Sequence, residues 1–243
     1  KAAGIIPFAH GGQAWQDATV FEAVAMGLGG NNYYKNCYVD LKESCLRSET
    51  TVKVFDQMRK LQSYTDEGSP GRDWNVATGM VIEGKAGFQI MGDWAKGEFT
   101  AAGKVPGVDY YCAATPSNNG YLYNVDSFIF YKSSDPDKQA GQQLLAKLMM
   151  GKNFQKVFNL YKGSIPARLD VSMDEFDKCA KTSNADIKTA GAKGGLVPSF
   201  AHGMAQGNTM KAALQDIITE HFNSDMSSVD AANALADSVL ANM

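Results

Sequence analysis

The pattern of apolar positions along the chain predicts short strands that alternate with amphipathic helices. Residues 5–9 form a short apolar run typical of a strand, and residues 18–28 keep apolar side chains at helical spacing until a pair of glycines ends the run. Residues 48–64 predict a second helix on the same grounds. Residues 69–76 have a loop composition, and the tryptophan among them can belong either to the core or to an aromatic surface.

The second half of the chain continues this alternation. Residues 108–114 and 121–131 have the apolar and aromatic pattern of strands, and residues 116–120 between them have the composition of a turn. Five helices are then predicted. The first begins at Asp135-Pro136, the second ends at Gly163 and the third begins at a Ser172–Glu175 capping box. The last two cover residues 208–222 and 227–242. The fold class is therefore α/β with many helices.

Residues 87–98, with the sequence GFQIMGDWAKGE, are the first candidate for chemistry. An apolar run that we expect to be a buried strand ends at a glycine and places Asp93 beside Trp94. A carboxylate next to an indole suits a pyranose, because the carboxylate accepts hydrogen bonds from hydroxyl groups and the ring contacts a C–H face. The alternative is structural: Asp93 would cap the helix that follows, and Trp94 would fill the core.

Three further polar residues lie where secondary structure alone does not require them. Asp126 interrupts an aromatic strand, so it either caps a buried group or contacts a ligand. Lys162 ends a helix in the segment KGSIPAR, which suits a crossing between lobes, although its ammonium can also bond to the last helical carbonyls. His202 lies in a loop of small residues, where it either donates to a ligand hydroxyl or is a hydrogen-bonded surface histidine.

The composition is that of an ordinary globular protein and excludes several function classes. The 243 residues are 44% apolar and 20% charged, enough to bury one large core or two small ones. The net charge of −3 comes without a cluster of lysine or arginine, so we expect no nucleic-acid partner. No apolar run has membrane-spanning length. The first residues lack the features of a signal peptide, so we expect the chain to be either mature or incomplete.

The four cysteines are Cys37, Cys45, Cys112 and Cys179. Their spacing fits neither a zinc knuckle nor a C-x-x-C redox motif, so we expect no metal site and no cofactor. Two interpretations stay open, namely two disulfides in an exported protein or buried free thiols in a cytosolic one. If disulfides form, the local pair is Cys37 with Cys45, and it would leave Cys112 with Cys179.

Five motifs occur along the chain in the order HGGQAW, MGDWAKGE, NVDSF, KGSIPAR and SFAHGMA. Together they make the chain similar to the glucose-binding members of the extracellular solute-binding proteins that supply ABC sugar importers. The resemblance implies a two-lobe periplasmic-binding-protein fold (type II, maltose-binding-protein-like) with the sugar held between α/β lobes. It also implies that Trp94 stacks on the sugar, that Asp126 accepts bonds from its hydroxyls, and that Lys162 and His202 donate to its oxygens. Asp93 completes the expected set of ligand-binding residues.

The chain departs from this family in its length. Two such lobes need about 400 residues, and the segments that begin the first lobe of family members are absent here. We therefore expect mainly the C-terminal lobe, made from residues 1–114 and 166–243. Residues 115–165 would be a return excursion that belongs to the N-terminal lobe. This excursion should expose apolar surface unless the missing N-terminal lobe or another fragment covers it.

From the resemblance we expect a non-catalytic, exported protein of the periplasm that binds glucose or a related monosaccharide. Its partners would be that sugar and an ABC permease of the inner membrane, and its working motion would be hinge closure. The alternative is a glycoside hydrolase or other carbohydrate-active enzyme that uses Asp93 and Asp126. A hydrolase built on Cys112 and His202 lacks the supporting G-x-S-x-G motif.

Overall fold

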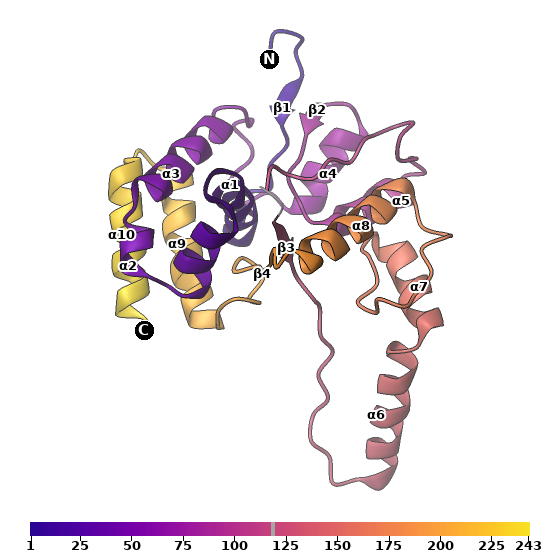
Figure 1. Cartoon of the computed structure of the whole chain (residues 1–243). Coiled ribbons are helices and arrows are strands. Elements are labelled where there is room, and N and C mark those ends of the chain that lie inside the picture. The colour runs from indigo at the N-terminus through magenta and orange to yellow at the C-terminus, as the bar shows by residue number, and fades with distance from the viewer. Residues whose placement is uncertain (118–119) are drawn as a thin grey trace. The chain divides into compact units, whose positions relative to one another are not determined.

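The computed structural model describes residues 1–117 and 120–243 (Figure 1), so Asn118 and Asn119 of the predicted turn lie outside the described residues. The described chain folds as two compact units. Unit 1 consists of Lys1–Gly92, Ala113–Asn124 and Ala185–Met243, and unit 2 consists of Asp93–Cys112 and Val125–Asn184.

Unit 1 is built from helices and two pairs of short strands. The strands are β1 (Ile6–Phe8) with β2 (Ala86–Phe88), and β3 (Tyr121–Tyr123) with β4 (Leu196–Pro198), each pair parallel. Ile6 lies opposite Ala86 in the first pair, and Tyr121 lies opposite Leu196 in the second. The helical elements are α1 (Ala14–Tyr34), the π-helix η1 (Lys35–Val39), α2 (Glu43–Leu46), α3 (Glu49–Gln62), α4 (Trp74–Ile82), α9 (Asn208–Asn223) and α10 (Ser228–Ala241). Parallel pairing fits the α/β class, because parallel strands need a crossover connection.

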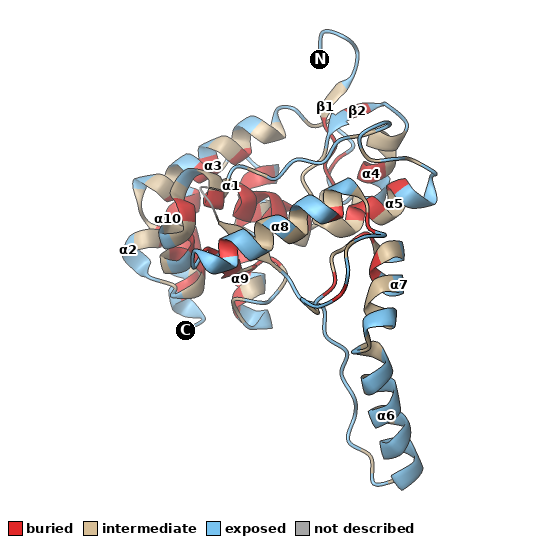
Figure 2. Cartoon of the chain, turned by 45° about the vertical axis from the view of Figure 1, so that its right-hand side comes forward, coloured by how far each residue is buried: buried red, intermediate tan, exposed pale blue. Residues whose placement is uncertain are grey.

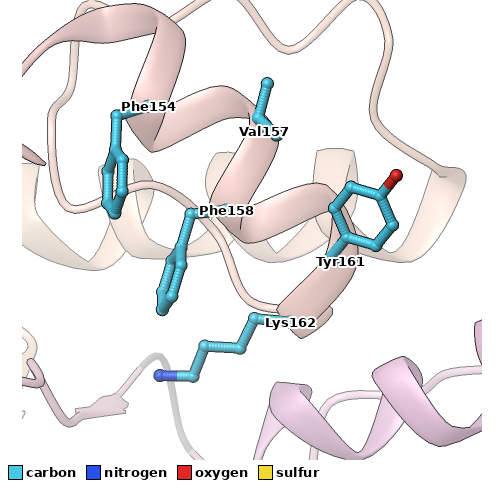
Figure 3. A pocket seen from close by; sticks show the side chains of 5 residues that line it. All are labelled: Phe154, Val157, Phe158, Tyr161 and Lys162. Carbon is cyan, nitrogen blue, oxygen red and sulfur yellow. The ribbon is translucent and has the colours of Figure 1, made fainter.

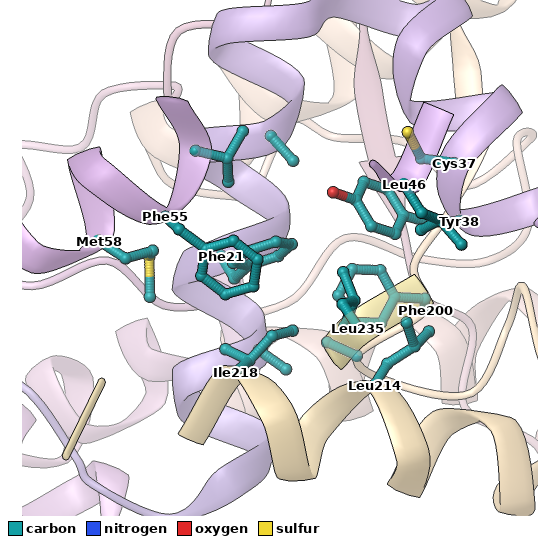
Figure 4. Packing of buried hydrophobic residues seen from close by; sticks show 14 of the residues in the cluster. Phe21, Cys37, Tyr38, Leu46, Phe55, Met58, Phe200, Leu214, Ile218 and Leu235 are labelled. Carbon is teal, nitrogen blue, oxygen red and sulfur yellow. The ribbon is translucent and has the colours of Figure 1, made fainter. Parts of the chain in front are cut away.

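The main core of unit 1 joins α1, α3, α9 and α10 (Figure 4). Phe21 from α1 and Phe55 from α3 meet Leu214 and Ile218 from α9 and Leu235 from α10, and all five side chains are buried. Burying a side chain of this size stabilises the fold by about 1.5–3 kcal/mol. This core fixes the position of α1, and with it the side chains that α1 directs at the loop after β4.

Unit 2 has much less buried apolar surface. Its elements are the 3₁₀ turn η2 (Asp93–Ala95), α5 (Lys96–Ala101), α6 (Pro136–Met149), α7 (Lys152–Lys162) and the first part of α8 (Lys178–Ala192). Its small core centres on Val171, Phe176 and Ala180. No residue of α6, which is described in full, is buried, and Figure 2 shows this helix exposed along its length. Leu144 is 71% exposed and Leu148 is 60% exposed.

Most of the predicted helices are confirmed. The helices α3, α6, α7, α9 and α10 lie where the apolar spacing places them. Ser48 caps α3 by accepting from the Thr51 N–H, Asp135 caps α6, and Gly163 ends α7 in the left-handed conformation. The helix α1 begins earlier than predicted, at Ala14, and continues beyond Gly30, where a φ of 71° interrupts it.

The predicted strands of the second half are mostly wrong. Among the described residues, 108–114 form no strand, and the strand predicted over 121–131 ends at Tyr123. A strand needs a neighbouring strand to satisfy its backbone groups, and residues 124–131 belong to none of the described strand pairs. The strand before Asp93 was predicted to be buried, but Phe88 at its end is 75% exposed.

The capping box predicted at Ser172 and Glu175 is also wrong. The Ser172 hydroxyl donates to Asp174 at 2.7 Å, so it closes a local turn and caps no helix. The helix α8 begins six residues later, at Lys178, and Asp177 accepts from the Ala180 N–H at 2.8 Å. The Ser172 oxygen accepts the Asp174 N–H at 3.2 Å, whereas the box required it to accept the Glu175 N–H.

The boundaries of the two units differ from the segments 1–114, 115–165 and 166–243 expected from the sequence. Residues 93–112 join residues 125–184 because α5 packs against α7 and a disulfide links Cys112 to Cys179. The assignment of 115–165 to an N-terminal lobe, and of the remainder to a C-terminal lobe, stays a prediction.

All four cysteines form disulfides, which agrees with the interpretation as an exported protein. Cys37 pairs with Cys45 in unit 1, and Cys112 pairs with Cys179 in unit 2. Disulfides persist in oxidising compartments such as the bacterial periplasm. The disulfides in the structure are therefore the pairs expected from the sequence if disulfides form, Cys37 with Cys45 and Cys112 with Cys179.

We expect the Cys112–Cys179 disulfide to stabilise the protein more than the Cys37–Cys45 disulfide. The two bonds span 67 and 8 residues, and the loop-entropy relation gives about 4.4 and about 2.5 kcal/mol. Urea denaturation of Cys112→Ser/Cys179→Ser, with Cys37→Ser/Cys45→Ser as the matched control, measures the difference. A larger loss in the control would contradict this expectation.

Candidate functional site

Unit 2 contains four of the five residues predicted to bind a ligand, namely Asp93, Trp94, Asp126 and Lys162. Asp93 and the half-buried Trp94 form the turn before α5, and Lys162 is the last residue of α7. Gly163 allows the end of α7 to approach the turn η2 closely. Its φ is +91°, and a Cβ atom at this position would lie only 2.6 Å from the backbone nitrogen of Gly97. The glycine thus brings the end of α7 against the turn that carries Asp93.

Asp93 is held by the backbone that follows α7. Its Oδ2 accepts the Ile165 N–H at 3.2 Å. Burial raises the pKa of the Asp93 carboxyl, while the Ile165 N–H and the charges of Lys96 and Lys162 oppose this rise in pKa. The carboxylate therefore ties the turn η2 to the segment after α7. It is not the N-cap of α5, which is Ala95, so the structural alternative of a helix cap is wrong. A contact with ligand stays a prediction.

Asp126 and Lys162 form an ion pair. Asp126 is 58% exposed and lies in the extended segment after β3. The Lys162 ammonium also lies 5.7 Å from the centre of the Phe158 ring. The end of α7 is closed by the Gly163 N–H, which bonds to the Asn159 carbonyl. An ammonium and a carboxylate side by side offer a donor and an acceptor to neighbouring hydroxyl groups.

A hollow of about 520 Å³ lies along α7 next to this ion pair (Figure 3). It is lined by Phe154, Val157, Phe158, Tyr161 and Lys162. Figure 3 shows the lysine chain extending past the Phe158 ring. These walls are mainly apolar, whereas a sugar needs several polar contacts in addition to an aromatic platform. The lining of the hollow is therefore better suited to packing against an apolar surface of another segment or chain than to binding a monosaccharide.

His202 belongs to unit 1, in the loop after β4. Its Nε2 lies 3.2 Å from the Thr19 hydroxyl, and that hydroxyl donates to the Trp15 carbonyl at 2.8 Å. Because the hydroxyl has one proton, Nε2 is the donor in the contact with Thr19. The Trp15 ring meets the imidazole edge to face, with centres 5.8 Å apart. The imidazole is therefore held from α1 by a hydrogen bond and a ring contact.

The loop that carries His202 is itself held by Glu22, a fully buried carboxylate of α1. Glu22 accepts from the Ser199 hydroxyl at 2.7 and 2.9 Å, from the Tyr34 hydroxyl at 3.0 Å and from the Ala201 N–H at 3.3 Å. Burial raises the pKa of Glu22 to about 7, although each of these hydrogen bonds favours the ionised form. The site in unit 1 thus includes a carboxyl group that titrates near neutral pH.

His202 is held by Trp15, Thr19 and Glu22, and none of these three residues was predicted to belong to the site. Trp15 lies within the quoted motif HGGQAW, so a signal for it was present although no role was assigned. Glu22 had no such signal, because its partner Ser199 is 177 residues away in the chain. A lone glutamate in a helix otherwise suggests only a solvated side chain.

Residues 1–117 and 120–243 offer neither a metal-binding cluster nor a membrane-spanning helix. No group of three or more histidine, cysteine, aspartate or glutamate side chains in this part of the chain is arranged to hold a metal ion. None of the described helices is both long enough and apolar enough to cross a membrane.

Comparison with known proteins identifies the family. Residues 4–190 match the bacterial extracellular solute-binding protein family. The chain is 48% identical over 240 residues to a probable sugar-binding periplasmic protein of Brucella suis, covering 98% of this chain and 56% of that protein. A probable sugar-binding periplasmic protein of Rhizobium meliloti is 46% identical over 98% of this chain and 58% of its own length. The chain therefore belongs to the extracellular solute-binding proteins, and it spans a little over half the length of these relatives.

Solved structures agree on the fold. A Streptococcus pneumoniae solute-binding protein in complex with the blood group A-trisaccharide matches with a TM-score of 0.67 at 19% identity, over 99% of this chain and 60% of that one. The bacterial solute receptor AcbH, described as preferring β-D-galactopyranose, matches with a TM-score of 0.69 at 15% identity, over 99% and 62%. The predicted α/β two-lobe periplasmic-binding-protein fold is confirmed, with this chain holding part of it. A preference for glucose stays a prediction.

We expect Glu22 to make folding stability depend on pH. Its pKa is raised from 4.5 to about 7 in the folded protein, so the folded state holds this proton more tightly than the unfolded state does. The resulting stabilisation is complete below the unfolded pKa and is lost as the pH rises through about 7. Relative to Glu22→Gln, the wild type should lose about 3 kcal/mol between about pH 5 and about pH 8.

Urea unfolding at the two pH values measures this difference. Glu67→Gln changes an exposed carboxylate of the same unit and serves as the control, which should follow the wild type. If Glu22→Gln and the wild type lose stability in parallel, the pKa of Glu22 is not raised in the folded protein.

Proposed function

We propose that this protein is the exported substrate-binding component of an ABC importer, and that it binds glucose or a related monosaccharide in the periplasm. The observation that carries the proposal is the grouping of an indole, a carboxylate and an ammonium around the start of α5 and the end of α7 in unit 2. Membership of the solute-binding family and the names of its sugar-binding relatives support it. An ABC permease of the inner membrane is the proposed partner that takes the sugar.

Each residue has a chemical role in this proposal. Trp94 offers its ring to the C–H face of the sugar, which adds about 0.5–1.5 kcal/mol beyond the area that is buried. Asp126 and Lys162 exchange part of their ion pair for bonds to sugar hydroxyls, and bonds to charged groups contribute about 1.5–3 kcal/mol each. His202 is proposed to contact a sugar oxygen, and Asp93 either joins the contacts or supports Trp94. The sugar would make contacts in the closed form of the whole protein that the open form lacks. Sugar binding would therefore shift the population of the protein to the closed form.

The exposed apolar residues of unit 2 support a further part of the proposal. Phe128, Ile129 and Tyr131 are exposed in the segment after β3, and Leu144 and Leu148 are exposed on α6. Such a patch on a monomer usually marks an interface. We propose that it is covered by the N-terminal lobe, which would come from the part of the relatives that this chain does not match.

The complementation of the two parts tests the proposed function. We expect the 243-residue chain alone to bind glucose weakly and to associate through its exposed patch, because only part of the cleft is present. Adding the part of the Brucella suis relative that this chain does not match, as a separate polypeptide, should give a stable complex and stronger sugar binding by calorimetry. Full-strength binding by the chain alone, as a compact monomer, would contradict the two-lobe mechanism.

Trp94→Ala should weaken glucose binding at least tenfold in this complex, because the stacking contact and its buried area are both lost. The control is Trp74→Ala, which removes an indole from the start of α4 in unit 1. Calorimetric titration with glucose compares the two variants with the wild type. Equal affinity of Trp94→Ala and the wild type would remove Trp94 from the site.

One observation favours a second candidate function. A glycoside hydrolase needs a carboxyl group of raised pKa as its acid, and burial raises the pKa of Asp93. Asp93 is, however, bonded to the Ile165 N–H, which restricts its use as an acid. Incubation with labelled glucosides distinguishes the two functions: turnover that is lost in Asp93→Asn indicates a hydrolase, and binding without turnover indicates a receptor.

A further inference from the structure

We propose that Glu22 is a positioning residue for sugar binding, because it fixes the backbone of the loop that presents His202. The inference rests on the proposed function in one respect, the contact between His202 and the sugar. Glu22 itself is buried and would not touch the ligand. Its role is to decide where the His202 loop lies relative to α1.

The backbone of the loop converges on Glu22 through three consecutive N–H groups. The Ala201 N–H donates directly to the carboxylate at 3.3 Å. The His202 N–H donates at 3.1 Å to the Ser199 hydroxyl, which in turn donates to Glu22. The Phe200 N–H donates at 3.0 Å to the Tyr34 hydroxyl, which also contacts Glu22. One carboxylate therefore holds, directly or through a hydroxyl group, the three backbone N–H groups of residues 200–202.

A carboxylate suits this position because both of its oxygens accept hydrogen bonds. Two hydroxyl groups and one backbone N–H donate to Glu22. A glutamine amide has one acceptor oxygen and an NH₂ donor, so in the glutamine variant a hydroxyl that faces the NH₂ has to accept instead of donate. The Ser199 hydroxyl bonds to both oxygens of Glu22 and to the His202 N–H. We expect the rearranged hydrogen bonds of Ser199 to shift the loop that carries His202.

The same helix face also holds the imidazole ring. Trp15, Thr19 and Glu22 are spaced by four and three residues, which places them on one side of α1. Trp15 contacts the ring edge to face and Thr19 bonds to its Nε2, while Glu22 holds the backbone. This stripe fixes both ends of His202, and a preorganised side chain loses less conformational freedom when a ligand binds.

A double-mutant cycle tests the inference. Glucose affinity is measured for the wild type, Glu22→Gln, His202→Ala and the double variant, in the complex with the added part of the Brucella suis relative. We expect each single variant to weaken binding by on the order of tenfold, and the double variant to bind no more weakly than His202→Ala alone. Glu67→Gln, which changes an exposed carboxylate of the same unit, should bind like the wild type.

Three outcomes would overturn the inference. They are normal binding by Glu22→Gln, an equal loss from Glu22→Gln with and without His202, and normal binding by His202→Ala. If Glu22→Gln does not fold, Ser199→Ala removes only the link to His202 and should show the same lack of additivity.

A readout that needs no sugar separates this inference from the proposed function. In the NMR spectrum of the 243-residue chain, Glu22→Gln should shift the ring resonances of His202 while those of His221 stay in place. A protein that binds no sugar but shows this shift would contradict the proposed function and support the positioning by Glu22. An unchanged His202 signal would overturn the positioning itself.

Discussion

The buried carboxylate of Glu22 is the interaction on which the polar part of unit 1 depends. A carboxylate removed from water is strongly destabilising unless donors surround it. Its donors come from Tyr34 and from the loop at Ser199 and Ala201, so the loop cannot leave without stranding a buried charge. Because α1 is fixed by the core that Phe21 shares with α3 and α9, the loop takes its position from that core.

Unit 2 is held together by a different set of interactions. Its apolar core is small, and the disulfide between Cys112 and Cys179 supplies a constraint that the core does not. The buried Lys96 also forms an ion pair with the partly exposed Asp177, with 2.7 Å between their charged atoms, and this pair is a further constraint on the unit. The close approach at Gly163 then places Lys162 near Asp93. The candidate ligand residues of this unit are thus positioned by backbone packing, in a region whose remaining surface is apolar and exposed.

The sequence predicted the features that depend on neighbouring residues. Helices such as α3, α6 and α7 follow from apolar spacing within one segment, and Ser48, Asp135 and Gly163 mark their ends. Strands were predicted poorly because pairing is not local: β3 pairs with β4, more than 70 residues later, while the equally strand-like residues 124–131 form no strand among the described residues. The contact of Glu22 with Ser199 is of the same non-local kind, so the pattern around Glu22 could not indicate it.

The two groups of candidate residues also differ in how firmly they are held, and this difference bears on the choice between receptor and hydrolase. Exposed ion pairs contribute only about 0–1 kcal/mol, so the Asp126–Lys162 pair can exchange partners with sugar hydroxyls at little cost. His202, in contrast, is fixed at its backbone and at its ring. A receptor can use both kinds of group, because exchangeable charges admit a ligand and a fixed side chain selects its shape. A glycosidase instead needs an accessible carboxyl group of raised pKa that is free to transfer a proton. Of the two carboxyl groups with a raised pKa among the described residues, Glu22 is buried and Asp93 is bonded to the Ile165 N–H. The arrangement of charges therefore favours recognition over catalysis.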